Sequence, residues 1–115
     1  MKYLYLLYAD ESKMAAPGSP QFDAQNDAFN KYYEELDGKS MFKAGDPVQG
    51  SKTSKTVRVR SGSTQATAGP FVQGGDQLVG IYVIEAKDLD EAVEYAAKCP
   101  AAHAGAVEVR PIFSM

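Results

Sequence analysis

A single cysteine and a single histidine, Cys99 and His103, lie four residues apart, a spacing that two metal ligands can share. A zinc site needs three or four protein ligands, and the chain has no second cysteine or histidine to supply them. Carboxylates could complete the set, but no acidic residue is singled out by its spacing. We therefore expect no metal site, and instead a helix end that buries a small thiol.

Acid–base chemistry near neutral pH would depend on His103, the only imidazole in the sequence. A nucleophilic dyad would need Cys99 or a serine brought to this histidine by the fold. No Gly-x-Ser-x-Gly nucleophile elbow occurs in the chain. A solvated loop histidine is the simpler interpretation, and a general acid or base is the alternative.

Arginines on predicted strands are the other candidates for ligand contacts. Arg58 and Arg60 share one face of an alternating strand, and Arg110 lies on the last predicted strand. Guanidinium groups on a sheet can hold a small carboxylate or phosphate. Ion pairing with Glu108 or another carboxylate is the plainer interpretation. The lysines of the Ser/Thr-rich stretch at 51–56 are expected to be solvated.

The first half of the chain predicts a strand followed by a helix. Residues 3–9 are apolar throughout, which is typical of a strand covered on both faces and short for the apolar region of a signal peptide. Ser19 followed by Pro20 marks a helix N-terminus, and Gly38 lies near its end. The expected buried stripe of this helix consists of Phe22, Phe29, Tyr33 and Leu36.

The second half predicts a hairpin, a strand, a helix and a final strand. Residues 46–55 are an exposed connection or loose hairpin, residues 56–60 pair with 63–67, and residues 77–86 form a long apolar strand. Asp88 and Glu91 form a capping box for a helix that Pro100 closes. Its expected buried face is Leu89, Ala92, Val93, Ala96 and Ala97. The last strand covers 107–113, with Val107, Val109 and Phe113 on one face.

This order of elements predicts an α+β fold: a ferredoxin-like sandwich with an added β-hairpin. Both faces of the first and the long strand are apolar, and two amphipathic helices can cover only one face of the sheet. We therefore expect a homodimer that forms face to face through the uncovered side.

Composition limits the remaining alternatives. The 115 residues suffice for one domain, residues 1–115, and a net charge of −3 gives no bulk attraction to nucleic acid or to a membrane. One cysteine excludes an internal disulfide framework and favours a cytoplasmic protein. Gly69 and Gly74 imitate a phosphate-binding loop without its Lys and Ser/Thr, so we expect no nucleotide and no other cofactor.

The combined motifs resemble the YCII-related family, in the branch named for its Asp-Gly-Pro-Phe signature. The resemblance covers essentially the whole chain. It rests on Met1–Tyr3, Tyr8–Glu11, Thr67–Phe71, Gln77–Tyr82, Asp88–Ala92, Pro100 and Val107–Pro111. It implies a dimeric α/β-barrel built from ferredoxin-like protomers. Some members of the branch are linked with extracytoplasmic-function sigma factors, which implies a regulatory setting.

The resemblance implies less about activity. An Asp and a His are a proposed catalytic pair in the wider family, but this chain has Ala68 in place of the signature Asp. The candidate catalytic residues are therefore His103, Asp10 and Asp76. Candidate ligand contacts are Tyr8, Arg110 and Phe71. A small-ligand-binding or regulatory module is the preferred interpretation, and an enzyme that uses His103 as its general acid or base is the alternative.

Overall fold

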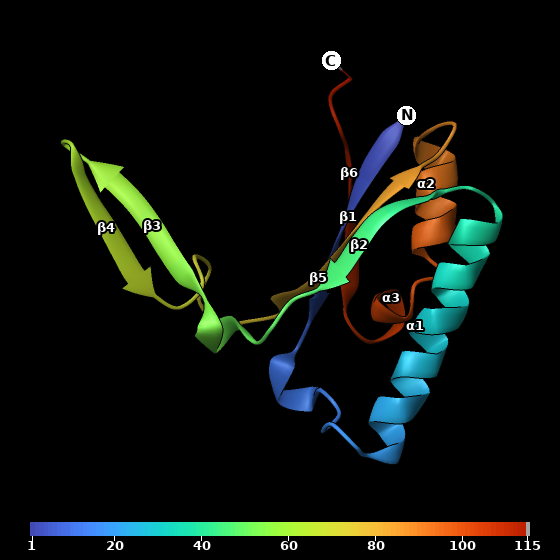
Figure 1. The fold of residues 1–115 in the computed structure, drawn as a ribbon, viewed down its shortest axis with the longest axis horizontal. Coiled ribbons are helices and arrows are strands. Elements are labelled where there is room, and N and C mark those ends of the chain that lie inside the picture. Colours follow the sequence, from blue (N-terminus) through green and yellow to red (C-terminus); the bar gives the residue numbers. More distant parts are fainter. Residues whose placement is uncertain (115) are drawn as a thin grey trace.

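One antiparallel sheet carries all the helices on a single face in the computed structural model, which describes residues 1–114 (Figure 1). The strands of this sheet follow the order β2-β5-β1-β6, with bounds Lys2–Ala9 (β1), Phe42–Pro47 (β2), Gln77–Glu85 (β5) and Ala106–Pro111 (β6). The helices are Pro20–Gly38 (α1), Leu89–Ala96 (α2) and Pro100–Ala104 (α3). Two short 3₁₀ turns are Glu11–Lys13 (η1) and Ser51–Thr53 (η2).

A second sheet consists of two strands alone, Lys55–Arg60 (β3) and Ser63–Ala68 (β4). We call residues 55–68 the arm. Figure 1 shows the arm projecting away from the main sheet on the side opposite to the helices. The prediction of an α+β fold is confirmed, and so is the pairing of residues 56–60 with 63–67.

Two elements were missing from the prediction. The sequence FKAGDP of β2 has Lys, Gly, Asp and Pro where a strand pattern needs apolar residues. The strand forms because these residues pair with β5 at an edge of the sheet. The five-residue helix α3 begins at Pro100, so this proline starts a helix as well as following one. At the other end, β6 stops at Pro111 and leaves Phe113 outside the strand and 92% exposed, contrary to the predicted strand over 107–113.

The N-terminus of α1 is capped as predicted, because the Ser19 hydroxyl accepts a hydrogen bond from the Phe22 N–H at 3.2 Å. Its C-terminus is also where the sequence placed it, at Gly38, and the left-handed residue that follows is Ser40, with φ 58°. The buried stripe differs by one position. Tyr32 is buried, whereas Tyr33 lies at the surface against the ring edge of Phe42.

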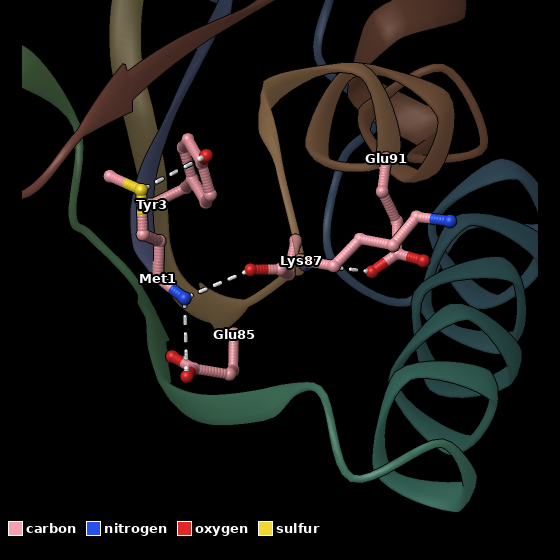
Figure 2. Close-up of polar contacts among 6 residues, drawn as sticks. Met1, Tyr3, Glu85, Lys87 and Glu91 are labelled. Atoms are coloured by element: carbon pink, nitrogen blue, oxygen red, sulfur yellow. Dashed lines mark hydrogen bonds and ion pairs between the residues drawn. The ribbon is translucent and has the colours of Figure 1, made fainter.

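Helix α2 begins at the predicted cap. The Asp88 carboxylate accepts from the Glu91 N–H at 2.8 Å, and the Glu91 carboxylate accepts from the Lys87 N–H at 3.0 Å. Figure 2 shows the bond between Lys87 and Glu91 beside the amino group of Met1, which contacts the Glu85 carboxylate and the carbonyl of residue 86. The start of the chain is thereby fixed to the end of β5.

The buried face of α2 is narrower than predicted. Ala92 and Ala96 are buried, but Leu89 and Val93 are 47% and 51% exposed, and Ala97 is exposed. The fully buried residues of α2 are therefore two alanines, and the partly buried Tyr95 also packs against the core.

The core lies between the helices and one face of the sheet. Tyr3, Tyr5 and Leu7 alternate into it from β1. The Tyr5 hydroxyl donates to the Ala92 carbonyl at 2.5 Å, and the Tyr32 hydroxyl donates to a carbonyl of the same helix at 2.9 Å. Burial raises the pKa of both phenols, so each remains a neutral hydrogen-bond donor.

The opposite face of the sheet, which we call the open face, carries apolar side chains and no helix (Figure 1). Register places Leu4 and Leu6 opposite Val83 and Ile81, and all are partly exposed. A β-bulge between Leu7 and Tyr8 shifts the alternation of side chains at the end of β5. Leu78 pairs with Tyr8 instead of joining the helix side, and Val79 packs against the core.

None of the described helices is long and apolar enough to cross a lipid bilayer.

Candidate ligand cleft

A cleft of about 670 Å³ lies where the base of the arm meets the end of the open face. This volume is in the range of small-molecule sites. Its walls come from three segments: the strand pair β1–β5, the connection that leads into β3, and the loop after β4. The lining residues are Tyr8, Val48, Gln49, Ser51, Thr53, Ser54, Lys55, Thr56, Val57, Pro70, Phe71, Val72, Gln77 and Leu78.

Tyr8 and Leu78 form the wall that belongs to the sheet. The bulge at Leu7/Tyr8 sets these two residues directly opposite each other across β1 and β5. Without the bulge, alternation along β5 would direct Leu78 toward the helices. The irregular register is therefore what supplies this apolar part of the cleft.

A hydrogen-bonded carboxylate holds the connection that leads into the arm. Glu11 accepts from the Ser51 N–H at 2.7 Å and from the Ser51 hydroxyl at 2.5 Å, which joins η1 to η2. These bonds from Ser51 hold the pKa of Glu11 below its usual range. Asp10 caps η1 by accepting from the Ser12 hydroxyl and N–H, and those bonds lower the pKa of Asp10. Both carboxylates act as acceptors that shape the chain next to the cleft.

The loop after β4 forms the outer wall. Gly69 has φ 105°, its N–H donates to the Ser54 carbonyl at 2.8 Å, and its carbonyl accepts from the Thr56 hydroxyl at 2.9 Å. Phe71 follows at the mouth of the cleft, 68% exposed, with the Arg58 guanidinium 5.0 Å from its ring centroid. The aromatic ring of Phe71 thus lines the cleft and is largely exposed to solvent in the protomer.

The lining combines apolar side chains with hydroxyl and amide groups. Lys55 is the one charged residue among the described residues that line the cleft, and these include no Asp, Glu or His. Such a surface can bind a flat, partly apolar molecule that carries hydroxyl or anionic oxygens.

The structure brings together two of the residues predicted as ligand contacts. Tyr8 and Phe71 both line the cleft, from opposite walls. Arg110 does not line it: this arginine lies on β6 at the sheet edge, where it donates to Glu108, the plainer alternative given above. The pair is exposed, so it contributes little to stability.

The candidate catalytic residues do not converge. His103 lies in α3 on the helix-covered side of the sheet, where its Nε2 is 3.0 Å from the Ala97 carbonyl. The expected loop histidine is therefore exposed but helical. Asp10 lies at the η1 cap, and Asp76 is exposed just before β5. Neither aspartate lines the cleft.

Cys99 is fully buried at the start of α3, and burial raises the pKa of its thiol to about 11. The thiol is therefore protonated and unreactive at neutral pH. Within residues 1–114, no three side chains of metal-ligating type come together.

Most of the polar lining was missed from the sequence. Ser51, Thr53, Ser54 and Lys55 belong to the stretch expected to be a solvated connection. The available signal was an unusual run of hydroxyl residues with no carboxylate. Only the tertiary contact through Glu11 shows that this run faces a cleft.

Comparisons with known proteins identify relatives of the whole chain and of part of it. The YCII-related domain matches residues 1–115. An uncharacterized protein of Rhizobium meliloti (strain 1021) is 39% identical over 59 residues, which are 50% of this chain and 48% of that protein. The aligned part is thus about half the length of this curated relative.

A solved structure has a similar fold. It is a 5-chloro-2-hydroxyhydroquinone dehydrochlorinase from Burkholderia phenoliruptrix AC1100 in complex with 2,5-dihydroxybenzoquinone. The TM-score is 0.54 at 22% sequence identity, and the alignment covers 100% of this chain and 96% of that chain. At this identity the likeness concerns the fold.

Proposed function

We infer that this chain, which belongs to the YCII-related family, is a small-ligand-binding module that works as a homodimer and holds its ligand in the cleft. The observation that carries this proposal is the composition of the cleft. Aromatic and aliphatic side chains from two walls face a row of hydroxyl groups and a single ammonium. That set can orient a small ring compound bearing hydroxyl or carboxylate oxygens, and the described lining includes no histidine or carboxylate.

An enzyme that uses His103 is the alternative. The solved structure with the similar fold is a dehydrochlorinase, and this supports a reaction on an oxygenated ring as the alternative function. The position of His103 favours binding over this alternative, since its imidazole contacts the Ala97 carbonyl at the end of α2, and α3 is separated from the arm by the sheet. Loss of any measured turnover in His103→Ala would reverse this preference.

The proposal also assigns the chain to the branch with the Asp-Gly-Pro-Phe signature, with Ala68 in place of its Asp. Ala68 ends β4 and is exposed, and the loop of Gly69, Pro70 and Phe71 follows directly. The loop that shapes the cleft is thus formed in this chain without an aspartate at position 68.

The homodimer of the proposal is a dimeric α/β-barrel of ferredoxin-like protomers that meet at their open faces, in the cytoplasm. The strand order β2-β5-β1-β6 with helices on one side supports a ferredoxin-like protomer. Six apolar side chains of the open face remain partly in water without a partner: Leu4, Leu6, Tyr8, Leu78, Ile81 and Val83. Burying side chains of this size favours association by about 1.5–3 kcal/mol each when the change is from fully exposed, so partial exposure gives a smaller sum.

The ligand class can be tested by calorimetric titration of the wild-type protein. Benzoate and 2,5-dihydroxybenzoquinone are suitable ring probes, and cyclohexanecarboxylate is the non-aromatic match for benzoate. Because a ring stacked on Phe71 gains about 0.5–1.5 kcal/mol, we expect Phe71→Ala to weaken binding of the aromatic probes roughly 2- to 13-fold. The same change should leave the binding of cyclohexanecarboxylate nearly as it was.

Phe113→Ala is the matched control, since this phenylalanine is also exposed and lies outside the cleft. Equal effects of the two substitutions would refute the assignment of the ligand to the cleft. Absence of heat and of thermal stabilisation for every ring probe at millimolar concentration would refute the proposed ligand class.

A further inference from the structure

The arm has two chemically different faces. Alternation and register place Lys55, Val57, Val59, Thr64, Ala66 and Ala68 on one face, which we call the valine face. The opposite face carries Thr56, Arg58, Arg60, Ser63, Gln65 and Thr67. Val57 and Val59 are 62% and 56% exposed, so the apolar side of this ribbon is open to water in the protomer.

Such a hairpin lacks support within its own chain. A two-stranded ribbon is at best marginally stable in water unless another layer packs on it. Of the twelve residues in β3 and β4, only Thr56 at the base is even partly buried. The left-handed Ser61 at its tip, with φ 52°, adds a small conformational cost. The regular strand pairing of the arm therefore requires a contact with another molecule.

The total surface of the protomer provides enough area for that contact. A monomer of 12.4 kDa exposes roughly 6,100 Å², whereas this chain exposes 7900 Å². The surplus of roughly 1,800 Å² exceeds the roughly 800 Å² that one partner contributes to a standard interface. The radius of gyration agrees, at 16.0 Å against roughly 13 Å for a compact chain of this length.

Charge favours a second copy of this chain as the occupant. Residues 47–75, the arm with its flanking loops, contain four basic residues and no acidic one. The rest of the chain contains eight basic and 15 acidic residues, a net charge of −7. A cationic extension and an anionic body on the same molecule are complementary between two copies, which favours their encounter. Arg58 and Arg60 lie on the face opposite the valine face, so the charges attract the arm to a second copy and the valines provide the apolar contact. A two-fold axis satisfies both contacts at once.

We propose that the arm of each protomer packs its valine face against the body of a second copy, which extends the interface beyond the open faces of the two sheets. This inference rests on the homodimer of the proposed function and adds the surface that secures it. Because the cleft lies at the base of the arm, seating the arm on the partner also fixes the outer wall of the ligand site.

Sedimentation equilibrium of Val59→Asp and Gln65→Asp tests the proposal. Both positions are exposed on the same ribbon, and both substitutions add one negative charge, but only Val59 lies on the valine face. We expect Val59→Asp to raise the dimer dissociation constant at least tenfold and Gln65→Asp to change it less than about threefold, with tenfold corresponding to about 1.4 kcal/mol. Amide exchange of the wild-type arm should also slow as protein concentration rises, a readout that needs no substitution.

The outcomes separate this inference from the homodimer itself. A dimeric wild type with equal dissociation constants for both variants, or with arm amides insensitive to concentration, would overturn the arm contact and leave the dimer standing. Equal weakening by both variants would also overturn it, because the effect would not be specific to the valine face. A wild type that stays monomeric at high micromolar concentration would overturn the homodimer together with the arm contact.

Discussion

Gly105 precedes β6, directly beside the end of β1, where a side chain has no room. A Cβ atom at this position would lie 2.0 Å from the Tyr8 carbonyl oxygen and 3.1 Å from the Ala9 Cα. Ordinary contacts of this kind are at 3.4–4 Å, so the backbone would have to move by more than about 1 Å. The atoms in the way belong to the main chain of a central strand, which cannot rotate aside as a side chain can.

The magnitude follows from two opposing effects of Gly105→Ala. Loss of backbone freedom in the unfolded chain stabilises the variant by about 0.4–1 kcal/mol. Overpacking that forces side chains and backbone to shift costs about 1–3 kcal/mol. Because the contact at 2.0 Å is with main-chain atoms, we take the upper end of this cost and expect a net loss of about 2–2.6 kcal/mol in the free energy of unfolding, measured by urea denaturation. The melting temperature should fall by roughly 8–10 °C.

Gly38→Ala is the matched control, because no atom lies within 4 Å of the added Cβ at the end of α1. This variant should be as stable as the wild type or more stable by up to about 1 kcal/mol. A Gly105→Ala protein within about 1 kcal/mol of the wild type would refute the assigned contact with Tyr8. Since Tyr8 lines the cleft, ring probes should also bind more weakly to Gly105→Ala and unchanged to Gly38→Ala.

Two further expectations concern the walls of the cleft. Ala68→Asp should change the free energy of unfolding by less than about 1 kcal/mol in urea denaturation, because position 68 is exposed and directly opposite Lys55; a loss above about 2 kcal/mol would contradict this exposure. Hydrogen bonds from Ser51 lower the pKa of Glu11 in the folded protein. These bonds stabilise the fold at pH values above the pKa that Glu11 has in the unfolded chain, and the stabilisation is lost as the pH falls through the lower pKa of Glu11 in the folded protein. The protection factor of the Ser51 amide should therefore fall between about pH 7 and about pH 3 in the wild type and stay flat in Glu11→Gln; a flat wild-type profile would contradict the contact.

The sequence predicted those elements whose signals are local. Ser19 and Asp88 cap their helices through bonds that span three residues, so residue type and spacing were sufficient. The arm was likewise visible in the alternation of residues 57–60 followed by a turn. In each case the information lies within a few positions of the chain.

The structural features that the sequence analysis did not predict depend on contacts between distant segments of the chain. Strand β2 exists because β5 offers it an edge, and nothing in its own six residues requires a strand. Tyr32 replaces Tyr33 in the core since the helix is rotated by its contact with the sheet, which a stripe of aromatic residues cannot specify to one position. The bulge that turns Leu78 onto the open face is similarly set by pairing with β1.

The candidate site shows the same division. Tyr8 and Phe71 were candidate ligand contacts, and both line the cleft. The hydroxyl wall that includes Ser51 required a tertiary bond from Glu11, 40 positions earlier in the chain. The sequence therefore named two of the lining residues, whereas only the fold indicated what stands opposite them.

The cleft and the residue at position 68 lead to one chemical conclusion. An aspartate there would stand opposite Lys55, which lines the cleft, and would add a carboxylate at the base of the arm. This chain has the methyl group of Ala68 at that position, followed by the loop that places Phe71 at the cleft mouth. With an ammonium unopposed by a carboxylate on the same strand pair, an anionic oxygen of a ligand meets attraction without competition. A methyl group at position 68 therefore fits the proposed binding of an oxygenated, negatively charged ring better than a carboxylate would.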